Sequence, residues 1–323
     1  MLKDLLENNQ CFKLVCGAGN EDAEEVEKLV TIYSLAGCQF FDVCAKPEIV
    51  DATKKGIQNS GIEQDRYICV SVGISGDPHI TKALINKDLC ITCGACKSIC
   101  PHDAIVYENG FNVNESRCIG CSKCLNICPQ KSISMYSKIQ DYEEVLPELI
   151  AKGIDCIEFH AISTDEDDVD KNWAILNNLY NGMLCISLDR SELGDKKLKE
   201  RVNRLLSSRK PYTTIIQADG VAMSGNDDEY GTTLQAVATA QLFQNAKMPV
   251  YIMMSGGTNI KSTQLTKMCG VYPNCLAVGS YARKIVKDYL QMKDLLSNPD
   301  SLNKAVEIAR NLVQTSLENL KRD

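Results

Sequence analysis

Short apolar runs alternate along this chain with longer segments in which apolar residues recur at helical spacing. Eight of the runs are typical of buried strands, because they are brief and almost continuously apolar. These expected strands span residues 12–17, 40–45, 67–73, 156–161, 183–189, 213–219, 249–257 and 275–280. Between them, residues 21–37 and 232–246 carry apolar side chains at positions i, i+3, i+4 and i+7, which predicts amphipathic helices.

Eight strands that alternate with helices predict parallel pairing in an α/β fold, most simply a (β/α)8 TIM-like barrel. A doubly wound open sheet is the alternative. That fold would use fewer strands and carry a glycine-rich fingerprint after the first one, whereas residues 17–20 (GAGN) form only part of such a motif. We therefore predict the barrel.

One stretch interrupts the alternation with a repeated cysteine motif. Residues 90–105 (CITCGACKSICPHDAI) and 118–133 (CIGCSKCLNICPQKSI) both follow the form C-x2-C-x2-C-x3-C-P. In the two-cluster ferredoxins that share this form, three thiolates close around one cubane and the fourth reaches the other. The expected metal ligands are Cys90, Cys93, Cys96 and Cys128 for one [4Fe–4S] cluster, and Cys118, Cys121, Cys124 and Cys100 for the second. Zinc also binds paired cysteines, but it does not require a quartet repeated twice and ended by Cys-Pro.

The position of this motif predicts the domain organisation. A ferredoxin-like domain at residues 80–138 would interrupt a barrel formed by residues 1–79 and 139–323, the latter ending in a C-terminal helix. Barrel enzymes place their active sites at the carboxyl ends of the strands. An insertion after the third strand is therefore expected to hold its clusters at the rim of the barrel mouth.

Composition narrows the function classes. The chain has 323 residues and a net charge of −7, which argues against nucleic acid as a partner. No apolar run reaches the ~18 residues of a membrane span, and the first ten residues lack the apolar run of a signal peptide. We expect a cytoplasmic protein without a membrane partner. Nine cysteines outside the motifs are expected to be mostly buried free thiols.

Polar residues occupy the ends of several expected strands, where a barrel would place its site. Asp42, His160 and Asp219 are candidate catalytic residues on this basis, although each could equally be structural. Lys13 is a fourth candidate, because a lysine inside an apolar strand is costly unless it is paired. It could extend to the bottom of the barrel or serve an anionic ligand or cofactor.

Glycines after the last two strands predict an anion site. Residues 255–259 (SGGTN) and 278–283 (VGSYAR) would bring backbone N–H groups towards a phosphate, such as that of FMN or another phosphate-bearing ligand. Thr258 is expected to begin the following helix, and residues 217–233 are expected to form a binding loop. Glycine turns without a ligand are the alternative. The candidate cofactor-binding residues are Gly256, Gly257, Thr258, Gly279 and Ser280.

Several of these stretches occur together in one known family. FKLVCGAG, DPHITKA, EFHA, QADGVAMSG and SGGTN resemble, in this order, the LdpA family, which is named for a cyanobacterial iron–sulfur protein linked to redox input into the circadian clock. The resemblance runs from about residue 12 to about residue 285 and implies a redox-active protein with two clusters. The candidate pocket residues that fall within family-like motifs are Lys13, Cys16, Asp42, His160, Gln217, Asp219, Gly220, Ser224, Gly225, Gly256 and Gly257.

Two functions follow from these patterns. The first is electron transfer or redox sensing, in which the clusters exchange electrons with a redox partner protein; the family resemblance and the lack of a flavin or nucleotide signature favour it. The second is an oxidoreductase, in which the clusters supply electrons to a flavin or a small-molecule substrate at the barrel mouth. A CxxxCxxC motif is missing, which argues against radical chemistry on S-adenosylmethionine.

Overall fold

The computed structural model describes residues 1–74, 77, 80–188, 190, 193–220 and 229–321. Eight parallel strands close into a barrel in the order β1-β12-β11-β10-β9-β8-β3-β2. The prediction of a TIM-like barrel is confirmed, and each expected strand agrees with an observed one to within two residues at either end. The barrel strands are β1 (Cys11–Gly17), β2 (Phe40–Cys44), β3 (Tyr67–Gly73), β8 (Cys156–His160), β9 (Met183–Leu188), β10 (Thr214–Asp219), β11 (Tyr251–Ser255) and β12 (Cys275–Val278).

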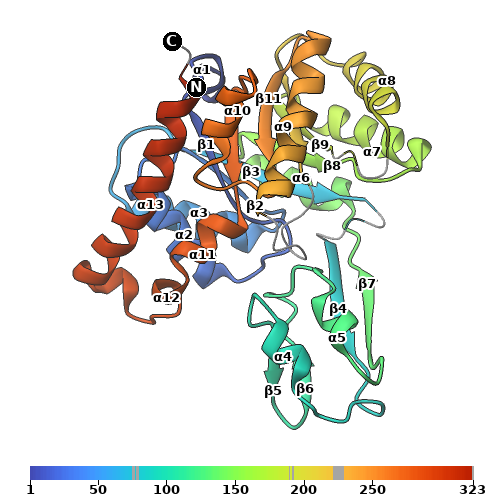
Figure 1. Cartoon of the computed structure of the whole chain (residues 1–323), viewed down its shortest axis with the longest axis vertical. Helices are drawn as coiled ribbons and strands as arrows, with labels where there is room; N and C mark the ends of the chain where they lie inside the picture. Colours follow the sequence, from blue (N-terminus) through green and yellow to red (C-terminus); the bar gives the residue numbers. More distant parts are fainter. Residues whose placement is uncertain (75–76, 78–79, 189, 191–192, 221–228, 322–323) are drawn as a thin grey trace.

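Helices surround the barrel and bury their apolar faces against it (Figure 1). Local sequence signals fix several of their starts: Asp22 accepts a hydrogen bond from the backbone N–H of Glu25 at an N-terminus, and Asp165 caps another in the same way. The outer helices are α2 (Ala23–Leu35), α3 (Pro47–Asn59), α6 (Tyr142–Ala151), α7 (Glu166–Leu179), α8 (Asp195–Leu206), α9 (Glu229–Ala246), α10 (Ser262–Met268), α11 (Ser280–Ile285), α12 (Lys287–Leu290) and α13 (Pro299–Leu320), with a short 3-10 helix, η2 (Leu295–Ser297).

The amino-terminal end of the barrel is closed by α1 (Leu2–Glu7). Its buried residues Leu2 and Leu6 belong to one apolar cluster with Phe40 and Tyr67, which lie where β2 and β3 begin. Five cysteines from the strands share this cluster: Cys11, Cys69, Cys156, Cys185 and Cys275. Eight of the nine cysteines outside the repeated motif are buried, and Cys269 is the exposed exception.

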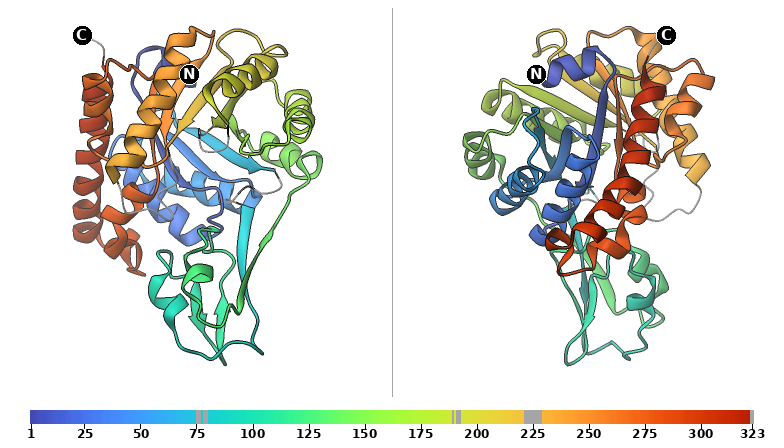
Figure 2. Two further views of the ribbon diagram at one scale, coloured as in Figure 1. Left: turned by 45° about the vertical axis from the view of Figure 1, so that its right-hand side comes forward. Right: turned by 90° about the vertical axis from the view of Figure 1, so that its left-hand side faces the viewer.

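The segment between β3 and α6 contains a separate small unit that projects from one end of the barrel (Figures 1 and 2). Two antiparallel strands, β4 (Thr81–Ile85) and β7 (Ile133–Ser137), lead the chain out and back. Between them lie α4 (Ala95–Ile99), the paired strands β5 (Ile105–Tyr107) and β6 (Phe111–Val113), and α5 (Lys123–Ile127). We call residues 81–137 the dicluster unit. Among the described residues, no helix combines the length and apolar character that crossing a membrane requires.

Candidate functional site

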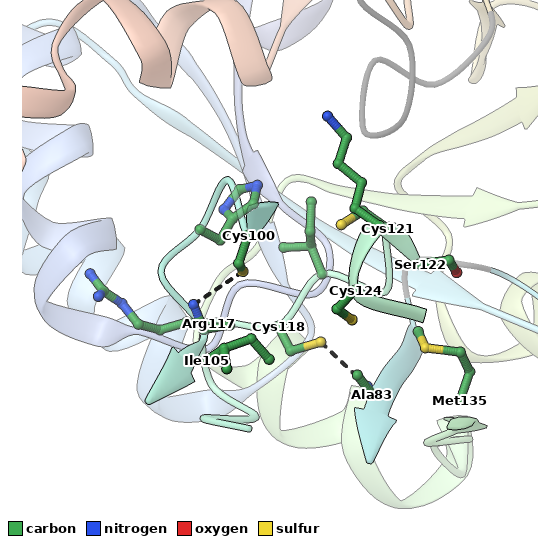
Figure 3. A pocket seen from close by; sticks show the side chains of 13 residues that line it. Ala83, Cys100, Ile105, Arg117, Cys118, Cys121, Ser122, Cys124 and Met135 are labelled. Carbon is green, nitrogen blue, oxygen red and sulfur yellow. Dashed lines mark hydrogen bonds between the residues drawn. The ribbon is translucent and has the colours of Figure 1, made fainter. Parts of the chain in front are cut away.

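Two cavities in the dicluster unit are each lined by four cysteines. The inner cavity is lined by Cys100, Cys118, Cys121 and Cys124 (Figure 3). The outer cavity is lined by Cys90, Cys93, Cys96 and Cys128. These are the two quartets that the spacing predicts, with the fourth cysteine of each motif exchanged.

The surroundings of the sulfur atoms suit iron–sulfur clusters. The backbone N–H of Ala83 donates to Cys118 Sγ at 3.4 Å and that of Ala104 donates to Cys100 Sγ at 3.3 Å, both drawn in Figure 3. Hydrogen bonds to the sulfur ligands are one of the features by which a protein tunes a bound iron–sulfur cluster. Burial and the neighbouring cysteines raise the pKa of Cys124 to about 11, so an apo cavity would hold neutral thiols there. Bound iron supplies the positive charge that keeps such thiols deprotonated.

The two halves of the dicluster unit repeat each other at an interval of 28 residues, the offset between Cys90 and Cys118. The backbone N–H of Asn86 donates to the carbonyl oxygen of Ser132 at 2.7 Å, and that of Asn114 donates to the carbonyl oxygen of Ala104 at the same distance. The residues that precede α4 and α5, Gly94 and Ser122, both adopt the left-handed conformation. The unit therefore has an internal pseudo-two-fold relation, and corresponding positions in its halves can be compared directly.

A third and larger cavity lies at the carboxyl ends of the barrel strands. We call this space, of about 220 Å³, the mouth cavity. The predicted residues that line it are Cys16, Asp42, His160, Gln217, Asp219, Gly220, Gly256, Gly257, Thr258, Gly279 and Ser280. His102 and Ile119 of the dicluster unit also line it, and both line the inner cavity as well. The inner cavity and the mouth cavity thus have a wall in common.

An ion-pair network forms the floor beneath the mouth cavity. Lys13 is fully buried; its Nζ lies 3.0 Å from Asp42 Oδ2, donates to Glu158 Oε2 and lies 3.3 Å from Gln217 Oε1. Gln217 Nε2 donates to Glu158 Oε1 at 2.7 Å, and Ser71 Oγ donates to Asp42 Oδ1 at 2.6 Å. Lys13 therefore does not extend to the bottom of the barrel. Burial lowers its pKa, but the neighbouring carboxylates, Asp42 foremost, raise it by more, so Lys13 stays a cation.

His160 links this network to the mouth cavity. Its Nε2 lies 3.0 Å from Glu158 Oε1 and its Nδ1 lies 2.7 Å from Asp77 Oδ2. Burial lowers the pKa of His160, but the two carboxylates raise it well above its ordinary value. A ring with a carboxylate at each nitrogen is stable when both nitrogens carry protons, so the structure holds His160 as an imidazolium in the cavity wall.

The acids of the floor differ in their protonation. Burial and the adjacent Glu158 raise the pKa of Asp42 to about 6, even though Lys13 opposes the shift. Burial also opposes ionisation of Glu158, but Lys13 and His160 hold its pKa well below the ordinary range. The floor thus contains one carboxyl group that titrates near neutrality beside one that stays ionised. Ligand atoms of Asp42, Cys69 and Glu158 lie within 4.8 Å of one another, as in a metal site, but the ammonium of Lys13 already neutralises this space.

The predicted phosphate-binding residues also line the mouth cavity, but several are fixed by packing. Gly256 and Gly257 both have positive φ angles, of 67° and 71°. A Cβ on Gly257 would lie 2.1 Å from Thr232 Oγ1, so glycine is required there whether or not a ligand binds. Thr258 Oγ1 donates to the carbonyl oxygen of Ala277 at 2.5 Å, and the expectation that Thr258 begins a helix is wrong, because α10 starts four residues later.

Gly279 and Ser280 lie on the other side of this edge, at the start of α11. A Cβ on Gly279 would lie 3.3 Å from Val15 Cβ, which makes Gly279 the more tolerant of the glycines here. Asp219 accepts a hydrogen bond from Ser187 Oγ. Residues 221–228 of the expected binding loop, Ser224 and Gly225 among them, lie outside the described residues, as does Asp189 at the end of the fifth expected strand. Most other residues of that stretch belong to β10 or to the start of α9.

Sequence comparisons agree with this geometry. Residues 148–315 match the Light dependent period A C-terminal domain, and residues 83–135 match the 4Fe-4S dicluster domain. Light dependent period A of Synechococcus elongatus is 30% identical over 332 residues, which cover 96% of this chain and 92% of the relative. This chain belongs to the light dependent period A family. The dicluster match supports iron–sulfur binding in this member of the family.

One solved structure, with a TM-score of 0.50, supports the barrel fold. The YdjI aldolase of Escherichia coli K12 superposes with a TM-score of 0.50 at 7% identity, covering 99% of this chain and 96% of the aldolase. A truncated 3-deoxy-D-arabino-heptulosonate 7-phosphate synthase of Thermotoga maritima has a TM-score of 0.47 at 10% identity, covering 94% of this chain and 85% of the synthase. At these identities the likeness concerns the fold alone.

Three residues of the site that come from outside the barrel strands were not among the sequence candidates. Asp77 holds His160, and its only signal in the sequence is its place in the family-like stretch DPHITKA. His102 follows the first Cys-Pro pair, a position that gives no sign of contact with a barrel. Arg283 lines the mouth cavity. Its Nε donates to Glu25 Oε1 at 2.7 Å and a terminal guanidinium nitrogen donates to Glu25 Oε2 at 2.6 Å, although the two residues are 258 positions apart.

Proposed function

We propose that this chain is an iron–sulfur electron-transfer protein that exchanges electrons with a small molecule held in the mouth cavity. The observation that carries the proposal is the common wall: His102 and Ile119 line both the inner cysteine cavity and the mouth cavity. The clusters, when bound, would supply one-electron transfer. A protein that served only a redox partner protein would have no need of a cavity of about 220 Å³ beside its inner cysteines.

The residues around the mouth cavity would bind the small molecule and hold protons for it. Each electron that a ligand gains leaves one negative charge, which one proton neutralises. His160 holds a proton at the cavity wall, and Glu158 connects it to Lys13. Val15, Ile119 and Ile162 give the wall apolar surface, while Asp219 and the backbone at Gly279 add hydrogen-bonding groups. This combination suits a flat, partly polar molecule such as a flavin.

Flavin binding tests the proposal. FMN, riboflavin and a simple phosphate ester are titrated into anaerobically reconstituted protein, with flavin fluorescence as the readout for the first two and calorimetry for the third. Ser280→Trp narrows the mouth cavity, and Ser207→Trp on the exposed end of α8 is the matched control. We expect FMN to bind, and Ser280→Trp to weaken binding at least about 10-fold, or 1.4 kcal/mol, at unchanged iron content.

The comparison of FMN with riboflavin isolates the phosphate. Tighter binding of FMN that weakens on Gly279→Val would place the phosphate near the start of α11, whereas Gly257→Val cannot be used because it clashes with Thr232. Failure of all three probes to bind, or equal losses in Ser280→Trp and Ser207→Trp, would contradict the mouth proposal. Electron transfer with a partner protein would then be the remaining function.

A further inference from the structure

The outer half of the dicluster unit leaves its cysteine loop uncovered. Residues 86–93 are exposed except for Cys90, which is half-buried. Leu89 is 53% exposed and Ile91 is 57% exposed, although both are large apolar residues. Ile91 and the exposed Cys93 also line the outer cavity. We call the surface formed by these three residues and by Lys87, Lys97 and Lys131 the outer face.

The corresponding loop of the inner half is covered by the barrel. Residue 117 corresponds to Leu89, and Arg117 Nε donates to Asp22 Oδ2 at 3.0 Å and lies near Glu25. The backbone N–H of Glu21 donates to the carbonyl oxygen of Ser116 at 2.7 Å. Ile119, which corresponds to Ile91, lines the mouth cavity. The chain therefore shows what this loop binds in one half: an acidic segment, residues 21–25, beside an apolar contact.

Charge on the outer face favours the same kind of partner. Lys87, Lys97 and Lys131 are all exposed, and Asp88 is the one acidic residue within residues 86–99 and 129–131. In the sequence, Lys87 follows Ile85 by two positions and Lys131 follows Gln130 directly, and both Ile85 and Gln130 line the outer cavity. This positive charge stands out on a chain whose net charge is −7. Opposite charge on a partner would steer it to this face and fix its orientation.

We propose that the outer face is the docking site of an electron-carrier protein with an acidic surface. The acidic segment 21–25 of the barrel, which binds the inner loop, is an example of such a contact within this chain. On the outer loop the lysines supply the positive charge for an acidic partner. A protein docked there brings its own redox centre beside Cys93, where the outer cavity reaches the surface. The inference rests on the proposed redox function but not on any ligand of the mouth cavity.

The test measures complex formation with reconstituted protein and a known carrier. An acidic [2Fe–2S] ferredoxin serves as the probe, and its binding is followed by calorimetry at about 20 mM and 200 mM salt. Lys87→Glu/Lys131→Glu reverses the charge of the outer face. Lys171→Glu/Lys197→Glu on α7 and α8 is the control with an equal charge change. We expect the first variant to weaken binding at low salt by about 10-fold or more and the control by less than about two-fold, since short-range pairing exceeds the effect of net charge.

Iron content and far-ultraviolet circular dichroism establish that the variants are folded and loaded. A third variant, Ile91→Asn, tests the apolar part and should weaken binding at both salt concentrations. Equal losses in the two double variants, binding that Lys87→Glu/Lys131→Glu leaves unchanged, or equally tight binding of a basic c-type cytochrome would overturn the docking proposal. None of these outcomes depends on flavin binding, so failure here and failure of the mouth proposal are separable.

Discussion

The two halves of the dicluster unit have nearly the same backbone and different surroundings. Both cysteine loops are preceded by an asparagine whose side chain accepts a backbone N–H two residues later, Asn86 from Asp88 and Asn114 from Ser116. The inner loop is bound to the barrel through Arg117, whereas the outer loop presents Leu89 and Ile91 to solvent.

The difference teaches that cluster binding and partner choice are specified by different residues. Cysteine spacing and the turns between the cysteines are repeated, so both halves can hold the same inorganic group. The residues just before each first cysteine are not repeated: Lys87 and Leu89 correspond to Glu115 and Arg117. Glu115 accepts a hydrogen bond from Tyr136 and pairs with Lys138 at 3.3 Å, close to the barrel. Differences at a few positions thus bind the inner loop to the barrel and leave the outer loop exposed to solvent.

The largest expected effect comes from breaking the exchange of ligands between halves. Cys100 belongs to the first cysteine motif, residues 90–105, but lines the inner cavity. Cys100→Ser should therefore remove the inner cluster and about half of the iron. Alkylation mapped by mass spectrometry should then label Cys118, Cys121 and Cys124 and spare Cys90, Cys93 and Cys96. Cys269→Ser is the control, since Cys269 is exposed and lies outside the unit. Labelling of the outer set instead would contradict the exchange.

The grouping of the eight cysteines around two cavities was predictable from sequence because it depends on local spacing. The barrel was predictable because its strands are short apolar runs. The floor of the mouth cavity was predictable only in part. Lys13 was conspicuous as a cation in an apolar strand, but Glu158 lies 145 positions away, and only barrel closure brings the two together. The double role of His102 depends on how the dicluster unit meets the barrel, which no local pattern encodes.

The glycines at the strand ends show how one sequence pattern can have two causes. Residues 255–259 were predicted to serve a phosphate, whereas Gly257 is required by its packing on Thr232. A glycine at a strand end has the same appearance in sequence whether a ligand or a neighbouring side chain approaches it. Close packing between β11 and the start of α9 is a tertiary fact, and the sequence carries no signal for it.

The second prediction concerns the ion-pair network at the floor of the mouth cavity, which lies on the side of the inner cysteine cavity. Because the pKa of His160 is raised in the folded protein, the protonated ring stabilises the fold fully below its unfolded pKa of about 6.5. This contribution is lost as pH rises towards the folded pKa. Asp42, with a pKa of about 6, is already ionised above pH 7 and adds no slope there.

The stability difference between wild type and His160→Gln should therefore shrink between pH 7 and pH 9, by at most about 1.4 kcal/mol per pH unit. Urea unfolding at several pH values measures it. A difference that stays constant over this range, or grows with pH, would mean that His160 is neutral in the folded protein.

The third prediction exchanges residues between the two loops. Arg117→Leu gives the inner loop the residue found at position 89 and removes the hydrogen bond to Asp22, which should cost about 1–2 kcal/mol because the pair is part-buried and charge-assisted. Hydrogen exchange should rise at residues 114–121 and in the segment 21–25. The reciprocal change, Leu89→Arg, meets no barrel residue and should alter stability by less than about 0.5 kcal/mol. Equal effects of the two changes would remove the asymmetry.

The smallest expected effect tests a backbone position at which the halves differ in residue but not in conformation. Thr92 has a φ angle of 54° and its counterpart Gly120 has one of 69°. A β-branched residue is strained in this region, whereas glycine enters it freely at some entropic cost. Thr92→Gly should therefore stabilise the unit by about 0.5–1 kcal/mol, the strain relieved less the added freedom of the unfolded chain. Gly120→Thr should destabilise it by more, because Gly120 is also buried.

Denaturant midpoints of the reconstituted variants measure both changes, and Thr92→Ala separates the effect of β-branching from that of backbone strain. A loss of stability in Thr92→Gly would mean that the Thr92 side chain makes contacts that outweigh the strain, and the two loops would then be alike in shape for different reasons.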